Sequence, residues 1–190
     1  MKKSLFFFLA VAALLLGGVS CDKSKNNKSN SFTLGDKTFS IASAGVYYNN
    51  EDKGYVLMVA DSVYDFTKRP CYPYTFICIE IPEQDLGTEF KVNSVPSSAM
   101  WNFYMACSIN QGSDFNASCG PSHSDFTQSS TIKISKDGDV WTIDINAETD
   151  PAADEMAFVV LKDKKDEESK LVTCHYQGKP TVTDYNISPF

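Results

Sequence analysis

The sequence predicts an all-β fold, a single antiparallel β-sandwich of about ten short strands. After residue 30, apolar and polar side chains alternate with a period of two almost throughout the chain. No stretch has the apolar spacing of a long amphipathic helix, and residues typical of turns separate the alternating segments. A calycin-like β-barrel, in which one sheet closes into a cup, is the alternative architecture that this pattern allows.

The clearest strands form a hairpin in the second half of the chain. Residues 140–146 alternate strictly between apolar and polar side chains, and residues 131–135 do the same. The turn between them, 136–139, contains Gly138, which can adopt a positive φ without strain.

Other strands follow from the same alternation. They are predicted at 32–34, 37–41, 45–48, 55–61, 74–81, 89–92, 101–110, 156–162 and 170–176. Gly35 and Asp36 join the first two as a tight hairpin. Residues 74–81 and 156–161 are apolar on both faces, which predicts central strands that are covered on both sides. Residues 82–87 predict one helical turn at most.

The charge of the chain argues against a nucleic-acid partner. Among 190 residues there are 17 basic and 24 acidic side chains, a net charge of −7. Without the two lysines of the first three residues, 15 basic side chains remain and the net charge is −9. Arg69 is the sole arginine and the lysines are scattered, whereas binding to phosphates requires clustered cations.

Residues 1–21 have the organisation of an export signal. Two lysines, an apolar run over 5–16 and the small residues 17–20 come immediately before Cys21. The apolar run is too short to span a bilayer. The segment resembles a bacterial lipoprotein signal, although Gly18 stands where a bulky aliphatic residue is more usual. The resemblance implies that Cys21 is lipidated and attaches the protein to a membrane; plain secretion is the alternative.

The predicted signal divides the chain into three parts. Residues 1–20 are the predicted signal peptide, and 21–30 are the lipidated cysteine with a polar tether. The tether contains no apolar side chain after Cys21, so it has nothing to bury. Residues 31–190 are predicted to form one all-β domain, which is long enough to bury most of its surface.

Five cysteines remain besides Cys21, so they cannot all pair within one molecule. Three of them alternate with apolar residues and are predicted to be buried thiols: Cys78, Cys107 and Cys174. Cys71 and Cys119 lie in predicted loops, where the backbone can bend to disulfide geometry. The predicted bridge is Cys71–Cys119, with Cys107–Cys119 as the alternative.

The two histidines give little ground for catalysis or metal binding. His123 lies in 122–125 with serine and aspartate, but the residues of one short loop rarely have triad geometry. Zinc binding by Cys119 with His123, or by Cys174 with His175, lacks a second matching pair of ligands. We therefore expect no catalytic residues, no metal and no cofactor; a hydrolase is the less favoured alternative.

Aromatic residues crowd the first half of the chain, several of them in a predicted loop over residues 61–74. They are Tyr47, Tyr48, Tyr55, Tyr64, Phe66, Tyr72 and Tyr74. Sugar rings stack on exposed aromatic faces, and tyrosine offers contact area at a low entropic cost. The predicted ligand-binding residues come from this loop and from an exposed strand end: Tyr64, Phe66, Arg69, Tyr72 and Trp101. Alternatively, the loop packs its aromatic side chains down onto the sandwich.

The lipidated cysteine, the polar tether and the single all-β domain together resemble the small cell-envelope lipoproteins of Bacteroidetes. Residues 132–146 and 172–179 are similar to the closing strands of many members. The resemblance implies an outer-membrane anchor, and it leaves open the leaflet and the oligomeric state. We expect a non-catalytic binding module for a glycan, a peptide or a partner protein. A structural or accessory subunit of a surface complex is the alternative.

Overall fold

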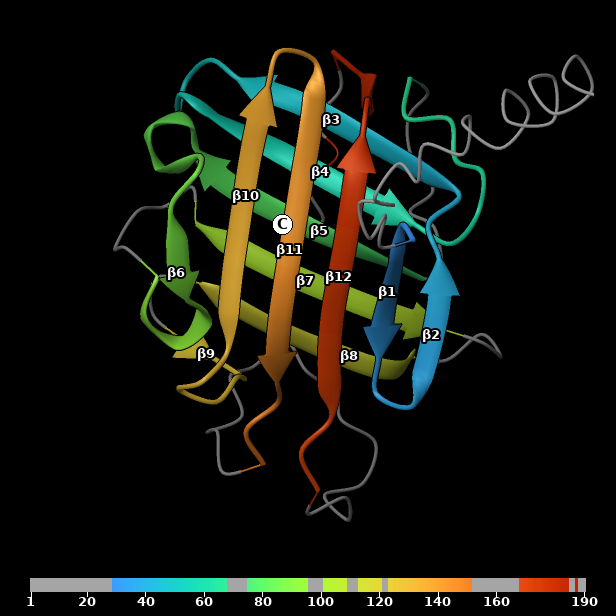
Figure 1. The fold of residues 1–190 in the computed structure, drawn as a ribbon, viewed down its shortest axis with the longest axis vertical. Helices are drawn as coiled ribbons and strands as arrows, with labels where there is room; N and C mark the ends of the chain where they lie inside the picture. Colours follow the sequence, from blue (N-terminus) through green and yellow to red (C-terminus); the bar gives the residue numbers. More distant parts are fainter. Residues whose placement is uncertain are drawn as a thin grey trace, which may run out of the picture.

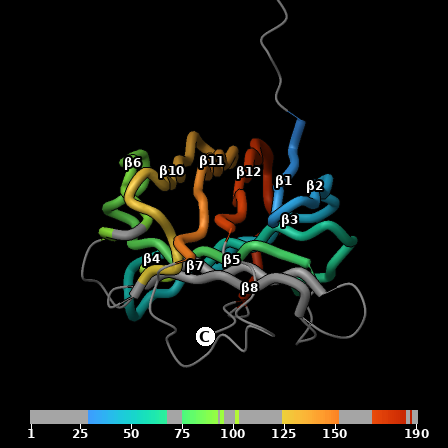
Figure 2. The backbone as a smooth tube through the Cα atoms, turned by 90° about the horizontal axis from the view of Figure 1, so that it is seen from below, coloured from blue at the N-terminus to red at the C-terminus, as the bar shows by residue number. Residues whose placement is uncertain are grey.

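Two β-sheets stacked face to face form the domain (Figure 1). The structure is a computed structural model that describes residues 29–67, 75–95, 101–108, 113–120, 123–151, 168–184 and 187. For 103–108, 113–120 and residues 93 and 123, it describes the backbone alone. Figure 2 shows the two layers from one end, with β10, β11 and β12 in one layer and β4, β5 and β7 in the other.

The first sheet has the strand order β2-β1-β12-β11-β10-β6. Its strands in chain order are β1 (Ser31–Leu34), β2 (Lys37–Ser40), β6 (Glu89–Lys91), β10 (Thr131–Asp137), β11 (Val140–Glu148) and β12 (Leu171–Gly178). All of its neighbouring strands are antiparallel.

The second sheet has the strand order β13-β3-β4-β5-β7-β8-β9. Its strands are β3 (Ser43–Asn49), β4 (Gly54–Ala60), β5 (Thr75–Pro82), β7 (Asn102–Ser108), β8 (Ser113–Gly120), β9 (His123–Ser124) and β13 (Thr181–Val182). Its one parallel pair is β13 with β3, at an edge of the sheet. Within the described part of the chain the two sheets share no strand, which confirms the predicted sandwich rather than the barrel.

The two predicted hairpins are confirmed. β10 and β11 pair from Thr131–Asn146 to Asp137–Val140, and the turn between them places Gly138 at a φ of 57°. β1 and β2 are joined in the same way, with Gly35 at a φ of 61°. Both glycines occupy the left-handed region, which a side chain would disfavour.

The main core lies between the sheets, where the inward side chains of both layers meet. Among its largest fully buried members are Trp101, Phe32, Leu57, Ile77, Ile79, Ile81, Ile132 and Ile134. β5 is buried along its whole length, which confirms the prediction of a central strand covered on both faces. Its outer face belongs to a second group of buried residues, called here the outer cluster: Val56, Met58, Ala60, Phe66, Phe76, Cys78 and Ile187.

Some elements differ from the predictions. The predicted helical turn is a 3-10 helix, η1 (Glu83–Asp85), and a second one, η2 (Val92–Ser94), follows β6. The strands β8, β9 and β13 were not predicted. Cys119 lies in β8 opposite Phe103, so its placement in a loop was wrong. The predicted strand 156–162 lies outside the described residues.

No helix in the described ranges has the length and apolar character needed to cross a bilayer.

Candidate binding site at one end of the sandwich

The described part of the 61–74 loop packs its aromatic side chains onto the second sheet. Phe66 is 2% exposed and belongs to the outer cluster, where its ring lies directly over Gly45. The ring of Tyr64 packs edge-on against Phe66, with 4.8 Å between centroids. Phe66 therefore contributes to packing and presents no ring face to solvent. Arg69 and Tyr72 lie outside the described residues, and ligand binding by this loop stays a prediction.

Trp101 also belongs to the packing of the domain. Its side chain is 1% exposed, and its ring lies edge-on to Phe90 at a centroid distance of 5.0 Å. Its Nε1 donates a hydrogen bond to Oδ2 of Asp85 at 2.7 Å. This bond satisfies the one polar atom of the buried indole. The Trp101 side chain therefore presents no ring face to solvent, and ligand binding by Trp101 stays a prediction.

The cysteines of the described residues are buried thiols where their side chains are resolved. Cys78 and Cys174 are free and buried, as predicted. Burial raises the pKa of both thiols, and the nearby carboxylates of Glu80 and Asp144 raise the respective values further. Cys21 and Cys71 lie outside the described residues, so lipidation and the Cys71–Cys119 bridge stay predictions, as does the buried thiol of Cys107, whose side chain is not described.

His175 lies on the outer face of the first sheet, while its neighbour Cys174 points into the core, as the alternation predicted. Its Nδ1 is 2.7 Å from Oδ1 of Asp144 on β11. Ser31 is its partner on the other side, so three neighbouring strands bring together the residue types of a hydrolase triad. The hydroxyl of Ser31 donates to the carbonyl of Ser29 at 3.2 Å, which does not position it as a nucleophile.

The sequence did not predict that Ser31, His175 and Asp144 lie side by side, because their proximity depends on the order of the strands in the sheet. A metal site would need further ligands, and no three His, Cys, Asp or Glu side chains in the described ranges come together as such a site requires.

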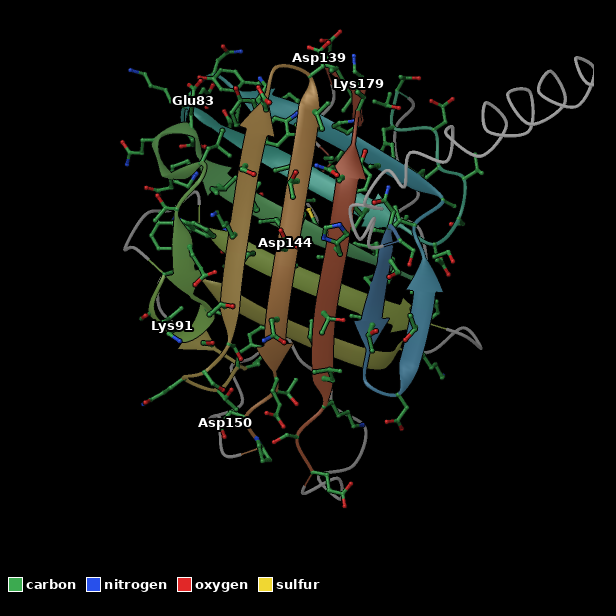
Figure 3. All side chains as sticks on the ribbon, viewed as in Figure 1. Glu83, Lys91, Asp139, Asp144, Asp150 and Lys179 are labelled. Carbon is green, nitrogen blue, oxygen red and sulfur yellow. The ribbon has the colours of Figure 1, made fainter. Side chains whose placement is uncertain are left out.

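A second arrangement lies at one end of the sandwich, where the inner faces of the two sheets open to solvent. Its members come from the β3–β4 hairpin, from η1 and from the β10–β11 hairpin, and we call them the end cluster: Tyr48, Tyr55, Glu83, Lys136 and Trp141. Figure 3 labels Glu83 and Asp139 near this end, at the top of the molecule, together with Lys179.

The strand register places the aromatic members. Tyr48 and Tyr55 are directly opposite each other in β3 and β4, and their rings lie 4.8 Å apart. Tyr55 is two residues before Leu57 in β4 and so lies on the same face of the strand. Because Leu57 belongs to the main core, Tyr55 faces the first sheet. There it meets the edge of Trp141 at a centroid distance of 4.8 Å. Trp141 is buried, whereas both tyrosines are partly exposed.

A carboxylate holds the two tyrosines in place. The hydroxyl of Tyr48 donates to Oε2 of Glu83 at 2.9 Å, and the hydroxyl of Tyr55 reaches Oε1 at 3.4 Å. The hydrogen bond to Glu83 is the main cause of a raised pKa at Tyr48, with smaller contributions from desolvation and from charge. Tyr48 therefore stays protonated at neutral pH and keeps its hydrogen-bonding proton.

This geometry provides aromatic faces of fixed orientation and a carboxylate acceptor at the edge of the core. Rings that are held by neighbours lose little entropy when a ligand binds to them. The end cluster can stack its aromatic faces against a ligand and accept hydrogen bonds at the carboxylate of Glu83.

Of the end cluster, sequence reasoning included Tyr48 and Tyr55 among the crowded aromatics. Glu83, Lys136 and Trp141 were not associated with them, because no sequence signal brings η1 next to two separate hairpins. Comparison with protein-family models, with curated proteins and with solved structures gave no match for this chain.

Proposed function

We propose that this protein is a non-catalytic binding protein of the cell envelope, anchored to a membrane through lipidated Cys21. The proposal joins an export signal ending at Cys21 to a polar tether, 22–30, and a β-sandwich. Two or more acyl chains on a cysteine give stable membrane attachment. The tether then separates the sandwich from the lipid surface. Glycans, peptides and partner proteins are the candidate ligands, and the anchor belongs in the outer membrane by its resemblance to envelope lipoproteins.

The end cluster is the observation that carries the binding role. Two partly exposed tyrosines stand side by side, and Glu83 fixes both hydroxyls. Ligand sites combine aromatic contact area with a few fixed polar groups, and the two tyrosines with Glu83 provide both.

The test uses the full-length protein in detergent on glycan and peptide arrays. Replacement of Tyr48 by alanine removes one ring of the end cluster, and Tyr64→Ala is its matched control on the outer face of the second sheet. Loss of binding in Tyr48→Ala alone supports the end cluster, whereas loss in Tyr64→Ala alone places the ligand at the 61–74 loop. An absence of binding to every array would contradict the binding role and favour the structural alternative.

The anchor has its own measurement. Mass spectrometry of the mature amino terminus is expected to find an acylated cysteine, and Cys21→Ser is expected to release the protein from the membrane fraction. An unmodified Cys21 in the wild-type protein would refute the anchor and leave the binding site unaffected.

A further inference from the structure

Lys136 occupies a position that the strand pattern reserves for an apolar residue. In β10 it follows Ile132 and Ile134 on the same face, and both isoleucines are fully buried in the main core. Its direct partner across the hairpin is Trp141, which is 3% exposed and belongs to that core. The lysine stem thus continues the inner face of the first sheet, and its charged end reaches solvent at the mouth of the sandwich.

The ammonium group of Lys136 lies over two aromatic rings. Its Nζ is 5.2 Å from the ring centroid of Tyr55 and 5.3 Å from that of Trp141. Both distances are within the range in which a cation is attracted to the negative face of a ring. Within the described part of the chain, neither Lys136 nor Glu83 takes part in an ion pair. The rings, rather than a carboxylate, are therefore the partners of this ammonium group.

The negative charge of the chain favours cations at its surface, although both signs lie around the end cluster. Carboxylates stand at Glu51, Asp52, Asp137 and Asp139, but Lys53 lies in the same turn as the first two and Lys179 is 3.4 Å from Asp139. The charge of the whole chain is negative, with a sequence pI of about 4.8. A negative surface raises the local concentration of cations and lowers that of anions.

We infer that the end cluster recognises an organic ammonium group, and that Lys136 is a built-in occupant which the ligand's ammonium displaces from Tyr55 and Trp141. This inference rests on the proposed binding role and specifies its ligand class. The displaced lysine has a flexible stem and moves into solvent at little cost, because its charge is already exposed. The incoming ammonium meets the same ring faces and lies near the carboxylate of Glu83.

Aromatic rings with an adjacent carboxylate bind ammonium groups whatever molecule carries them. Three sources share this chemistry: a choline headgroup, an amino sugar and a lysine side chain of a peptide. The experiment separates these sources.

Full-length protein is titrated by calorimetry with choline, with glucosamine and with a capped lysine amide. Each cation has a neutral partner as its control: dimethylbutanol, the carbon isostere of choline; N-acetylglucosamine; and a capped norleucine amide. We expect each cation to bind more tightly than its neutral partner, and the tightest of the three identifies the source.

The lysine itself is tested by substitution. Lys136→Met keeps an unbranched stem over the rings but removes the competing charge, so affinity for the cation is expected to rise about tenfold. Lys133→Met removes the same charge from the outer face of the same strand, where it has no ring contact, and is expected to leave affinity nearly unchanged. Lys136→Arg keeps a cation over the rings and is expected to keep affinity low.

Equal affinity for choline and dimethylbutanol, or equal gains in Lys136→Met and Lys133→Met, would overturn the inference. Neutral glycans that bind through Tyr48 while cations do not would also overturn it, and would leave the proposed function intact. Circular dichroism and urea unfolding of each variant establish that the fold is retained. If Lys136→Met does not fold, the comparison of charged and neutral ligands on the wild-type protein still decides whether the site recognises an ammonium group.

Discussion

Replacement of Gly45 by alanine tests how the 61–74 loop is held on the second sheet. An alanine Cβ at this position would lie 2.5 Å from Cγ, 2.7 Å from Cδ1 and 2.8 Å from Cδ2 of Phe66. These contacts are with the body of a buried ring, so the ring itself must move. Gly45 does not have a positive φ, so the alanine backbone is unstrained and the ring contact is the source of any destabilisation.

The magnitude follows from overpacking and from the burial of the ring. Insertion of a methyl group into a packed site costs about 1–3 kcal/mol. The ceiling is the cost of losing the ring altogether, about 3–5 kcal/mol for Phe66→Ala. We therefore expect Gly45→Ala to lower the free energy of unfolding by about 2 kcal/mol, which corresponds to a fall in Tm of about 4–8 °C.

The assay is a double-mutant cycle by urea unfolding. With Phe66 already replaced by alanine, the three atoms nearest to the new methyl group are gone, and Gly45→Ala is expected to stabilise the protein by up to about 1 kcal/mol through the unfolded state. The sign of the effect thus depends on whether the ring of Phe66 is present. Equal destabilisation in both backgrounds would show that Phe66 does not pack on Gly45 and would refute the reasoning.

Three further predictions concern polar and titratable groups. In Ser130→Ala the backbone amide of Glu148, which donates to the Ser130 hydroxyl at 3.0 Å, loses its side-chain acceptor. Urea unfolding is expected to show a free energy of unfolding lower by about 1–2 kcal/mol. Ser129→Ala, at an exposed serine in the adjacent turn, is the control. Cys174 is expected to resist iodoacetamide in the native protein at pH 8 and to react in urea, as peptide mass spectrometry can show, because burial raises the pKa of its thiol. The hydrogen bond to Glu83 raises the pKa of Tyr48 above the ordinary tyrosine value, and Glu83→Gln is expected to lower it, as the difference between the ultraviolet titrations of each protein with and without Tyr48→Phe can show. The pKa of Tyr48 is higher in the folded than in the unfolded protein. Its contribution to the free energy of unfolding is therefore complete below the unfolded-state pKa and is lost as the pH rises through the folded-state pKa.

The elements that sequence reasoning predicted correctly are those in which local pattern and turn chemistry agree. The β10–β11 hairpin has strict alternation on both strands and Gly138 at the turn, so each level of information indicates the same structure. β5 was identified because it is apolar on both faces, and its burial by two separate clusters explains that pattern.

The missed strands have weaker signals. Residues 114–119 of β8 (Ser113–Gly120) alternate between polar and apolar, but most residues of this strand are small or polar types that strands disfavour. β8 pairs with β7 across a register shift. β13 has two residues and pairs in parallel with β3, a contact between distant parts of the chain. β8 therefore lacked the residue types, and β13 the length, from which a strand is predicted.

The candidate site was only partly predictable for a related physical reason. A residue at the end of a sandwich falls on the same face of its strand as the core residues do. In the sequence, Tyr55 and Trp141 therefore cannot be told from ordinary core residues. Tyr55 and Trp141 differ from other core residues in lying at the end of the core, where the two sheets stop covering each other. Lys136 is the one member whose residue type departs from the pattern. In this chain, the lysine that breaks the inward row next to a turn lies over the ring faces of Tyr55 and Trp141. The cation titrations determine whether those faces bind ligands here.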